Sequence, residues 1–198
     1  MKHDVLIAGV GGQGNLFASR ILSTYALEKG LNVVGTETVG AAQRGGSVVS
    51  HVRISDGPVF SPLIPRGGAD VILGFEAIEM LRHMRLSNPD TVYILNMFKI
   101  PTAYVLMGID EYPADEQILA AAKRACKRGY VVNATEVAMK LGNVQVMNVV
   151  MVGALTQVDP FFPGGELRKV LEEVTPARFK AINLEAFDAG RELIKAAN

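Results

Sequence analysis

The sequence contains no tryptophan, only one cysteine, and no excess of either charge. Its 198 residues include 20 basic and 20 acidic ones, for a formal net charge of zero. Proteins that bind nucleic acid through its phosphates need a basic surface, so the composition does not support a nucleic-acid partner. Cys126 alone can form neither an internal disulfide nor a cysteine-based cluster. We therefore expect no metal site and no iron-sulfur centre in this chain.

Long apolar runs are also missing. The most apolar stretch, residues 144–158, is interrupted by amide side chains and is shorter than the ~20 residues that a membrane-spanning helix needs. The first residues do not resemble a signal peptide. We expect a cytoplasmic protein with no membrane segment. Hydrophobic residues make up 49% of the chain, which is enough for a sizeable core. The sequence shows no linker and no internal repeat, so we expect a single domain over residues 1–198.

Strand-like and helix-like segments alternate along most of the chain. Residues 5–8 and 32–37 are predicted to be strands, separated by a helix that ends at Gly30. Further strands are predicted at 69–75, 91–96 and 130–134, and helices at 76–85, 114–129, 135–142 (capped by Thr135), 143–158, 166–174 and 177–195.

One segment departs from this alternation. Residues 47–54 alternate with a period of two, "SDG" follows, and residues 58–64 are predicted to return as the second strand of a hairpin. Together these patterns predict an α/β fold, with a Rossmann-like, mostly parallel sheet, helices on both faces and an inserted β-hairpin.

A glycine-rich loop, "GVGGQG", lies between the first predicted strand and its helix. Gly9, Gly11 and Gly14 have the G-x-G-x-x-G spacing of dinucleotide-binding loops, and Glu37 lies roughly where a ribose-binding acid belongs. The N–H groups that begin a helix attract phosphate. The alternative is that these glycines only permit a tight turn between strand and helix.

A second cluster, "QRGGSVVSHVR", follows at residues 43–53. Gln43 and Arg44 precede two glycines, and His51 and Arg53 share one face of the predicted strand. Arginine suits carboxylates and phosphates. We interpret the cluster as an anion or interface site; the alternative is a solvated edge hairpin in which His51 is structural.

One polar residue and several missing motifs complete the pattern. Asn148 lies in the apolar stretch "VMNVVMV", where a buried amide either satisfies backbone groups or faces a site. The sequence has no P-loop, no pair of His and carboxylates at metal-binding spacing and no nucleophile elbow. We therefore expect part of an enzyme rather than a self-sufficient one.

The segments "GVGGQG", "AAQRGGSVVSHVRI", "SPLIPRGGADVILGFE" and "NVVMVGAL" together resemble the gamma-type domain of the 2-oxoacid:ferredoxin oxidoreductases, and within that family most nearly the indolepyruvate type. The resemblance spans residues 5–191. The residues that match the family motifs, and so form the expected coenzyme A or cofactor cleft beside Glu37, are Gly9, Gly11, Gly12, Gln13, Gly14, Gln43, Arg44, Gly45, Gly46, Ser47, His51, Arg53 and Asn148.

The resemblance implies an accessory subunit without a catalytic residue of its own. In such a complex an arylpyruvate is decarboxylated, its acyl group joins coenzyme A (CoA), and two electrons reach ferredoxin. Thiamine diphosphate, Mg²⁺ and [4Fe-4S] clusters are expected on a large alpha-type partner subunit. Val39 and Ala41 stand where the indolepyruvate type has His and Met, so pyruvate, branched-chain 2-oxoacids and 2-oxoglutarate stay open as substrates. A stand-alone dinucleotide-binding protein and a purely structural module are the alternatives from other classes.

Overall fold

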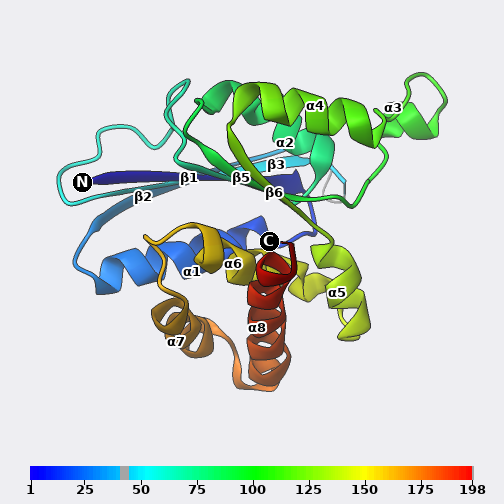
Figure 1. Ribbon diagram of the computed structural model, residues 1–198. Coiled ribbons are helices and arrows are strands. Elements are labelled where there is room, and N and C mark those ends of the chain that lie inside the picture. The colour runs from blue at the N-terminus through cyan, green and yellow to red at the C-terminus, as the bar shows by residue number, and fades with distance from the viewer. Residues whose placement is uncertain (41–44, 198) are drawn as a thin grey trace.

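A six-stranded sheet runs through the molecule in the computed structural model, which describes residues 1–40 and 45–197 (Figure 1). The strands lie in the order β2-β3-β1-β4-β5-β6. Their bounds are β1 Lys2–Val10, β2 Asn32–Val39, β3 Ser47–Ser55, β4 Val71–Gly74, β5 Val92–Asn96 and β6 Arg128–Val132. Strand β3 pairs antiparallel with both β1 and β2, whereas β1, β4, β5 and β6 pair in parallel.

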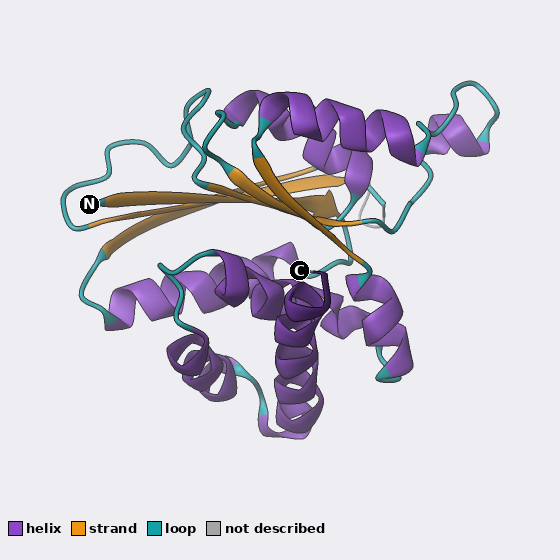
Figure 2. Ribbon diagram, in the orientation of Figure 1, coloured by secondary structure: helices purple, strands orange, loops and turns teal. Residues whose placement is uncertain are grey.

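Helices cover both faces of this sheet, as predicted (Figure 2). On the upper face in the figure lie α2 (Ala77–His83), α3 (Ala103–Leu106) and α4 (Asp115–Ala125). The lower face carries α1 (Asn15–Glu28), α5 (Ala134–Lys140), α6 (Met147–Val158), α7 (Gly164–Val174) and α8 (Lys180–Ala197). Three 3₁₀ turns, η1 (Met84–Leu86), η2 (Val144–Val146) and η3 (Ala177–Phe179), complete the elements.

Alternate residues of the strands divide the hydrophobic core in two. In β1, Val5 and Ile7 pack with α1 and α6, while Leu6 packs on the other side with residues of α2 and α4. Helix α6 is buried from Met147 to Leu155, and a Cβ at its Gly153 would lie 2.1 Å from the carbonyl oxygen of Phe187 in α8. The absence of a side chain there lets the two helices approach each other closely.

The inserted hairpin is present, but its second strand is not the predicted one. Strand β3 pairs with β2, from Asn32 opposite Ser55 to Val39 opposite Val48, while residues 58–64 form a loop. Two physical reasons account for the difference. Both edges of β3 are already hydrogen-bonded, to β1 and to β2, and the loop contains prolines, which lack the N–H that a strand ladder needs.

The predicted helices are present, but one of them is shorter than predicted, one cap differs and one short helix was not predicted. The helix predicted over 114–129 ends at Ala125, because the chain already pairs with β5 from Arg128 onward, so β6 spans Arg128–Val132 rather than the predicted 130–134. Thr135 does not cap α5, which begins after Asn133, because the Thr135 hydroxyl instead accepts a hydrogen bond of 2.8 Å from Asn96 Nδ2. The short helix α3, within a segment left unassigned by the sequence, is capped by Thr102. Within the described residues, no helix is both long and apolar enough to cross a membrane.

Candidate functional site

The glycine loop between β1 and α1 is held in shape by its own glutamine. Gln13 Oε1 accepts a hydrogen bond of 2.8 Å from the Val10 N–H, and Gln13 Nε2 donates one of 3.0 Å to the carbonyl of Phe75 at the end of β4. The side chain thereby connects the loop to the end of the neighbouring parallel strand. Gln13 thus braces the loop from within.

Gly14 and Asn148 form the second fixed point of this loop. Gly14 has φ +78°, and its carbonyl accepts a hydrogen bond of 3.1 Å from Asn148 Nδ2. A Cβ at position 14 would lie 2.0 Å from that amide nitrogen. Asn148 is buried at the start of α6, so the polar residue in the apolar stretch anchors the glycine loop onto the late helix. Only glycine suits position 14, for both reasons.

A pocket of about 590 Å³ opens beside the loop, within the range of small-molecule sites. Its apolar walls are formed by Val10, Leu16, Phe17, Val39, Val48, Val146, Pro176 and Phe179. Its polar lining consists of Asn15, Glu37, Asn143, Gln145, Asn148, Thr175 and Asn183, together with Gly11, Gly12 and Gly14. An apolar cavity with a few polar groups is the usual form of a ligand site.

The electrostatics of the pocket come from backbone dipoles and one acid. The first N–H groups of α1 have no partner within the helix, and the positive end of its dipole lies here. Glu37 Oε1 accepts hydrogen bonds from the hydroxyls of Ser19 (3.2 Å) and Ser50 (3.0 Å). Asn15 Oδ1 is buried without a hydrogen-bond partner in the described part of the chain. The described lining contains no lysine or arginine.

The glycines of the second cluster lie against the first loop. The Gly11 N–H donates a hydrogen bond of 2.8 Å to the Gly46 carbonyl, and the Gly45 N–H donates one of 3.4 Å to the Gly11 carbonyl. Gly9, Gly45 and Gly46 support the loop without lining the pocket. Gln43 and Arg44 lie outside the described residues, so the structure does not test the expectation that Arg44 faces an anion.

Ser47, His51 and Arg53 point to the opposite face of β3 from Val48 and Ser50, which lie on the α1 side. The Ser47 hydroxyl donates to Glu79 Oε2 at 2.5 Å, on α2. His51 and Arg53 do share a face, as the period of two predicts. The described residues that line the pocket include none of these three.

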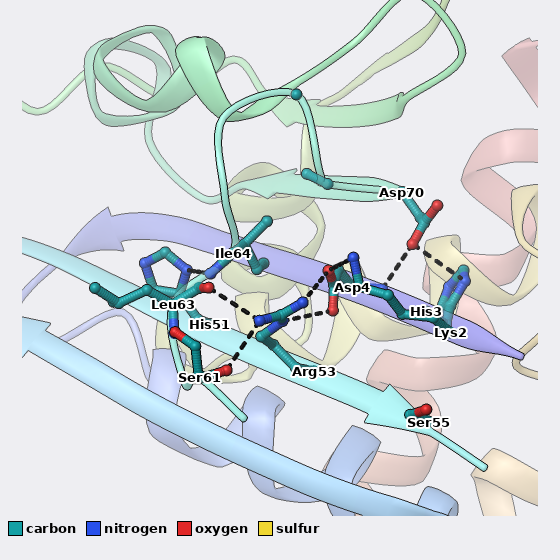
Figure 3. Close-up of polar contacts among 12 residues, drawn as sticks. Lys2, His3, Asp4, His51, Arg53, Ser55, Ser61, Leu63, Ile64 and Asp70 are labelled. Atoms are coloured by element: carbon teal, nitrogen blue, oxygen red, sulfur yellow. Dashed lines mark hydrogen bonds and ion pairs between the residues drawn. The ribbon is translucent and has the colours of Figure 1, made fainter. Parts of the chain in front are cut away.

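Arg53 and His51 instead hold the loop 58–64 over the sheet (Figure 3). Arg53 forms a paired contact with the fully buried Asp4, at 3.0 and 3.2 Å, and its Nη1 donates to the carbonyls of Ser61 and Leu63. His51 Nδ1 accepts a hydrogen bond of 3.1 Å from the Ile64 N–H.

The His51 ring can accept that bond because it is neutral. Burial lowers the pKa of His51, and electrostatic interaction with His83 and Arg53 lowers this pKa further. His51 therefore has a structural environment in this chain, fastening the loop to β3.

Several pocket residues escaped the sequence analysis. Asn143 Oδ1 accepts from the Gln145 N–H and shapes the turn η2, and Asn183 Nδ2 donates to the Phe179 carbonyl in the helices at the end of the chain. No local motif marks either residue, because only the packing of α6 and α8 against the loop brings them to the pocket. The late part of the chain offered one usable signal, the polar Asn148 in an otherwise apolar segment.

Comparison with known protein families assigns the class of protein to which this fold belongs. The chain belongs to the pyruvate ferredoxin/flavodoxin oxidoreductase family, whose model matches residues 4–193. This membership confirms the resemblance seen in the sequence.

Individual relatives narrow the comparison. Indolepyruvate oxidoreductase subunit IorB of Archaeoglobus fulgidus is 41% identical to this chain, with 96% of this chain and 94% of that protein aligned. The gamma subunit of the keto/oxoacid ferredoxin oxidoreductase of Geobacter sulfurreducens shares the fold, with a TM-score of 0.73, 22% identity, and coverage of 100% of this chain and 98% of that one.

A larger structure contains the same fold as one part. The 2-oxoglutarate:ferredoxin oxidoreductase of Magnetococcus marinus, solved with 2-oxoglutarate, coenzyme A and succinyl-CoA bound, matches with a TM-score of 0.74 and 22% identity. The match covers 98% of this chain and 31% of that one. The fold thus occurs both as a separate subunit and within a longer chain.

Proposed function

We propose that this chain is the small subunit of an indolepyruvate oxidoreductase. The complex converts an arylpyruvate, CoA and oxidised ferredoxin to an arylacetyl-CoA, CO₂ and reduced ferredoxin. The observation that carries the proposal is the 41% identity, over nearly the full length of both chains, to an IorB subunit. The 2-oxoglutarate synthase subunit KorC of Methanothermobacter marburgensis is 28% identical over 198 residues, a lower identity that favours indolepyruvate over 2-oxoglutarate as the substrate.

The cofactors are proposed to reside on a large partner subunit. Thiamine diphosphate and Mg²⁺ supply the carbanion chemistry of decarboxylation there, and [4Fe-4S] clusters carry electrons to ferredoxin. Within the described residues of this chain, no three His, Cys, Asp or Glu side chains gather as a metal site would require, and Cys126 is buried. These residues therefore do not fit a metal cluster, and no step of the chemistry is assigned to them.

We propose that the pocket beside the glycine loop receives part of CoA. The N–H groups at the start of α1 suit a phosphate oxygen, and the apolar walls suit the uncharged part of the molecule. Gln43 and Arg44 are proposed to supply the polar contacts and positive charge that the described lining lacks.

Two substitutions on one helix test this assignment. Leu16 lines the pocket and is 66% exposed, whereas Leu27 lies at the other end of α1 and is 60% exposed. In the assembled complex, Leu16→Trp should raise KM for CoA by about tenfold, equivalent to roughly 1.4 kcal/mol of lost binding, and should leave KM for the oxoacid unchanged. Leu27→Trp is the matched control and should change neither constant. If KM for CoA is unchanged in Leu16→Trp, CoA does not bind in this pocket.

Dinucleotide binding is the second candidate function, and one observation favours it. Glu37, the expected ribose-binding acid, lines the same pocket as Gly11 and Gly12. Against it, β3 lies between β1 and β2, whereas in a dinucleotide fold those two strands are neighbours. Calorimetric titration of the chain with NAD(H), NADP(H) and CoA separates the two functions, because tight nicotinamide binding with no response to CoA supports the dinucleotide function.

A further inference from the structure

The segment between β5 and α4 carries an apolar surface into solvent. In Figure 1, α3 projects beyond the body of the molecule beside the start of α4. Tyr104, Leu106, Met107 and Ile109 are between 60% and 76% exposed, and α3 buries none of its residues. We call residues 104–109 the tip. Soluble proteins seldom expose so many neighbouring apolar side chains unless the surface binds something.

The base of this projection is tied to a single buried carboxylate. Glu76, which caps α2 and is almost fully buried, accepts a hydrogen bond from the Ile100 N–H (3.4 Å) on one side of the projection. The same oxygen, Oε1, accepts the hydroxyl of Tyr112 on the other side. Burial, followed by the contact with Glu76, raises the pKa of Tyr112, so this hydroxyl keeps its proton and donates.

A lysine links the same two sides a second time. Lys99 Nζ lies 2.6 Å from Asp115 Oδ1 and 5.3 Å from the centre of the Tyr112 ring. These contacts close the base of the projection independently of its tip. The tip itself is a single helical turn, which would not be stable alone.

The anchored base gives the tip a defined shape before anything binds. A preformed apolar tip loses less conformational entropy on binding than a mobile loop does. The tip lies at the carboxyl ends of the parallel strands. The glycine loop follows the same end of β1. A partner that binds the tip would therefore lie at the carboxyl ends of the parallel strands.

The acidic residues next to the tip indicate which charge a partner's binding surface carries. Asp110 and Glu111 follow Ile109 directly and are exposed, and neither takes part in a salt bridge among the described residues. The residues from Ile100 to Ile109 include no charged side chain. A complementary surface therefore consists of an apolar socket with lysine or arginine at its rim.

We infer that the tip inserts into such a socket on the large partner subunit of the oxidoreductase; this inference rests on the function proposed above. A second copy of this chain is a poorer fit. Its apolar pocket contains Glu37 and, within the described lining, no lysine or arginine to meet Asp110 and Glu111.

The test uses the full chain and the large subunit, expressed separately. The double variant Leu106→Ser/Ile109→Ser changes only exposed tip residues, so its thermal unfolding should match the wild type. Its Kd for the large subunit, measured by biolayer interferometry, should rise by at least about tenfold. Asp110→Asn/Glu111→Gln should slow association at low salt and have little effect at high salt.

Phe60→Ser is the matched control. Phe60 is 94% exposed and lies in the loop 58–64, at the opposite end of β1 from the glycine loop, so this variant should bind like the wild type. If the tip variant binds as tightly as the wild type while the wild-type complex forms, the inference is wrong and the proposed function stands. If the wild-type chain does not bind the large subunit at all, the proposed function fails and the inference falls with it.

Sedimentation velocity tests whether a second copy of this chain binds the tip instead. If the wild-type chain is a homodimer, the tip variant is a monomer, and the Kd of the variant for the large subunit is unchanged, the socket belongs to a second copy and the inference is overturned.

Discussion

Among single residues, Gly14 and Asn148 determine the geometry of the candidate site. They are 134 residues apart in the chain, yet the amide of one donates to the carbonyl of the other. The contact fixes the start of α1 against the start of α6, and both residues line the pocket. The shape of the pocket therefore depends on a close approach that only glycine permits at position 14.

Substitutions at these two positions should be strongly non-additive. Gly14→Ala should lower the free energy of unfolding by about 2 kcal/mol or more, because φ is positive and the new Cβ collides with the amide. Asn148→Ala should cost about 1 kcal/mol through the lost hydrogen bond. The double variant should lose less than the sum of the two, because removing the amide relieves the collision.

Gly12→Ala serves as the control for the backbone effect alone. Gly12 also has positive φ, but a Cβ there would meet nothing within 4 Å. Its loss of stability in urea denaturation should be smaller than that of Gly14→Ala. Equal losses at both positions, or strict additivity in the double variant, would show that the collision with Asn148 has no energetic consequence.

Sequence reasoning named some of the residues that line the candidate pocket and missed others, for a physical reason. The glycines, Glu37 and Asn148 are recognisable because the spacing of a loop and a polar residue in an apolar helix are local signals. Asn143 and Asn183 carry no such signal, since they reach the pocket only through the packing of α6 and α8.

At the scale of elements, the antiparallel strand β3 decides which residues can reach the site. It lies between β1 and β2, so its alternate residues face opposite layers of the molecule. Val48 and Ser50 lie on the side of α1, whereas His51 and Arg53 lie under the loop 58–64 (Figure 3). The period of two was predictable, but which side would face the pocket depended on the strand's neighbours.

The sheet was predictable apart from that pairing. The parallel strands, as short apolar runs between helices, are strong local patterns. For β3, the turn "SDG" favoured the following segment as its partner. In the structure β3 pairs with the preceding strand β2 instead. Two carbonyls of the following loop accept hydrogen bonds from the Arg53 side chain rather than from a neighbouring strand.

Loss of Arg53 should therefore loosen this loop and destabilise the fold. Arg53→Met leaves the buried carboxylate of Asp4 with Lys2 (2.7 Å) as its remaining cation, so we expect a loss of about 2 to 3 kcal/mol in the free energy of unfolding. Protease cleavage within residues 58–64 should become faster under native conditions.

The exposed ion pair of Lys127 with Asp90 provides the matched control. Lys127→Met removes a surface contact of 3.5 Å and should leave both stability and cleavage unchanged. If Arg53→Met were as stable and as resistant to cleavage as Lys127→Met, the loop would not depend on the arginine.

At the scale of the whole molecule, two features follow the carboxyl ends of the parallel strands, and the described residues contain no cluster of side chains that could hold a metal ion. The pocket beside the glycine loop and the apolar tip both follow the ends of parallel strands. Both suit a subunit that borders a reaction site and binds the protein that contains it. This is the division of labour that the family membership and the proposed function imply.

The central claim is that this chain contributes to 2-oxoacid oxidation only as part of a complex. The most direct measurement is CoA-dependent reduction of a redox dye by the isolated chain, by the large subunit and by the reconstituted complex, each supplied with indolepyruvate, pyruvate and 2-oxoglutarate. We predict no activity from the isolated chain, and activity from the complex that is highest with indolepyruvate. Activity of the isolated chain with any of these oxoacids would contradict the account.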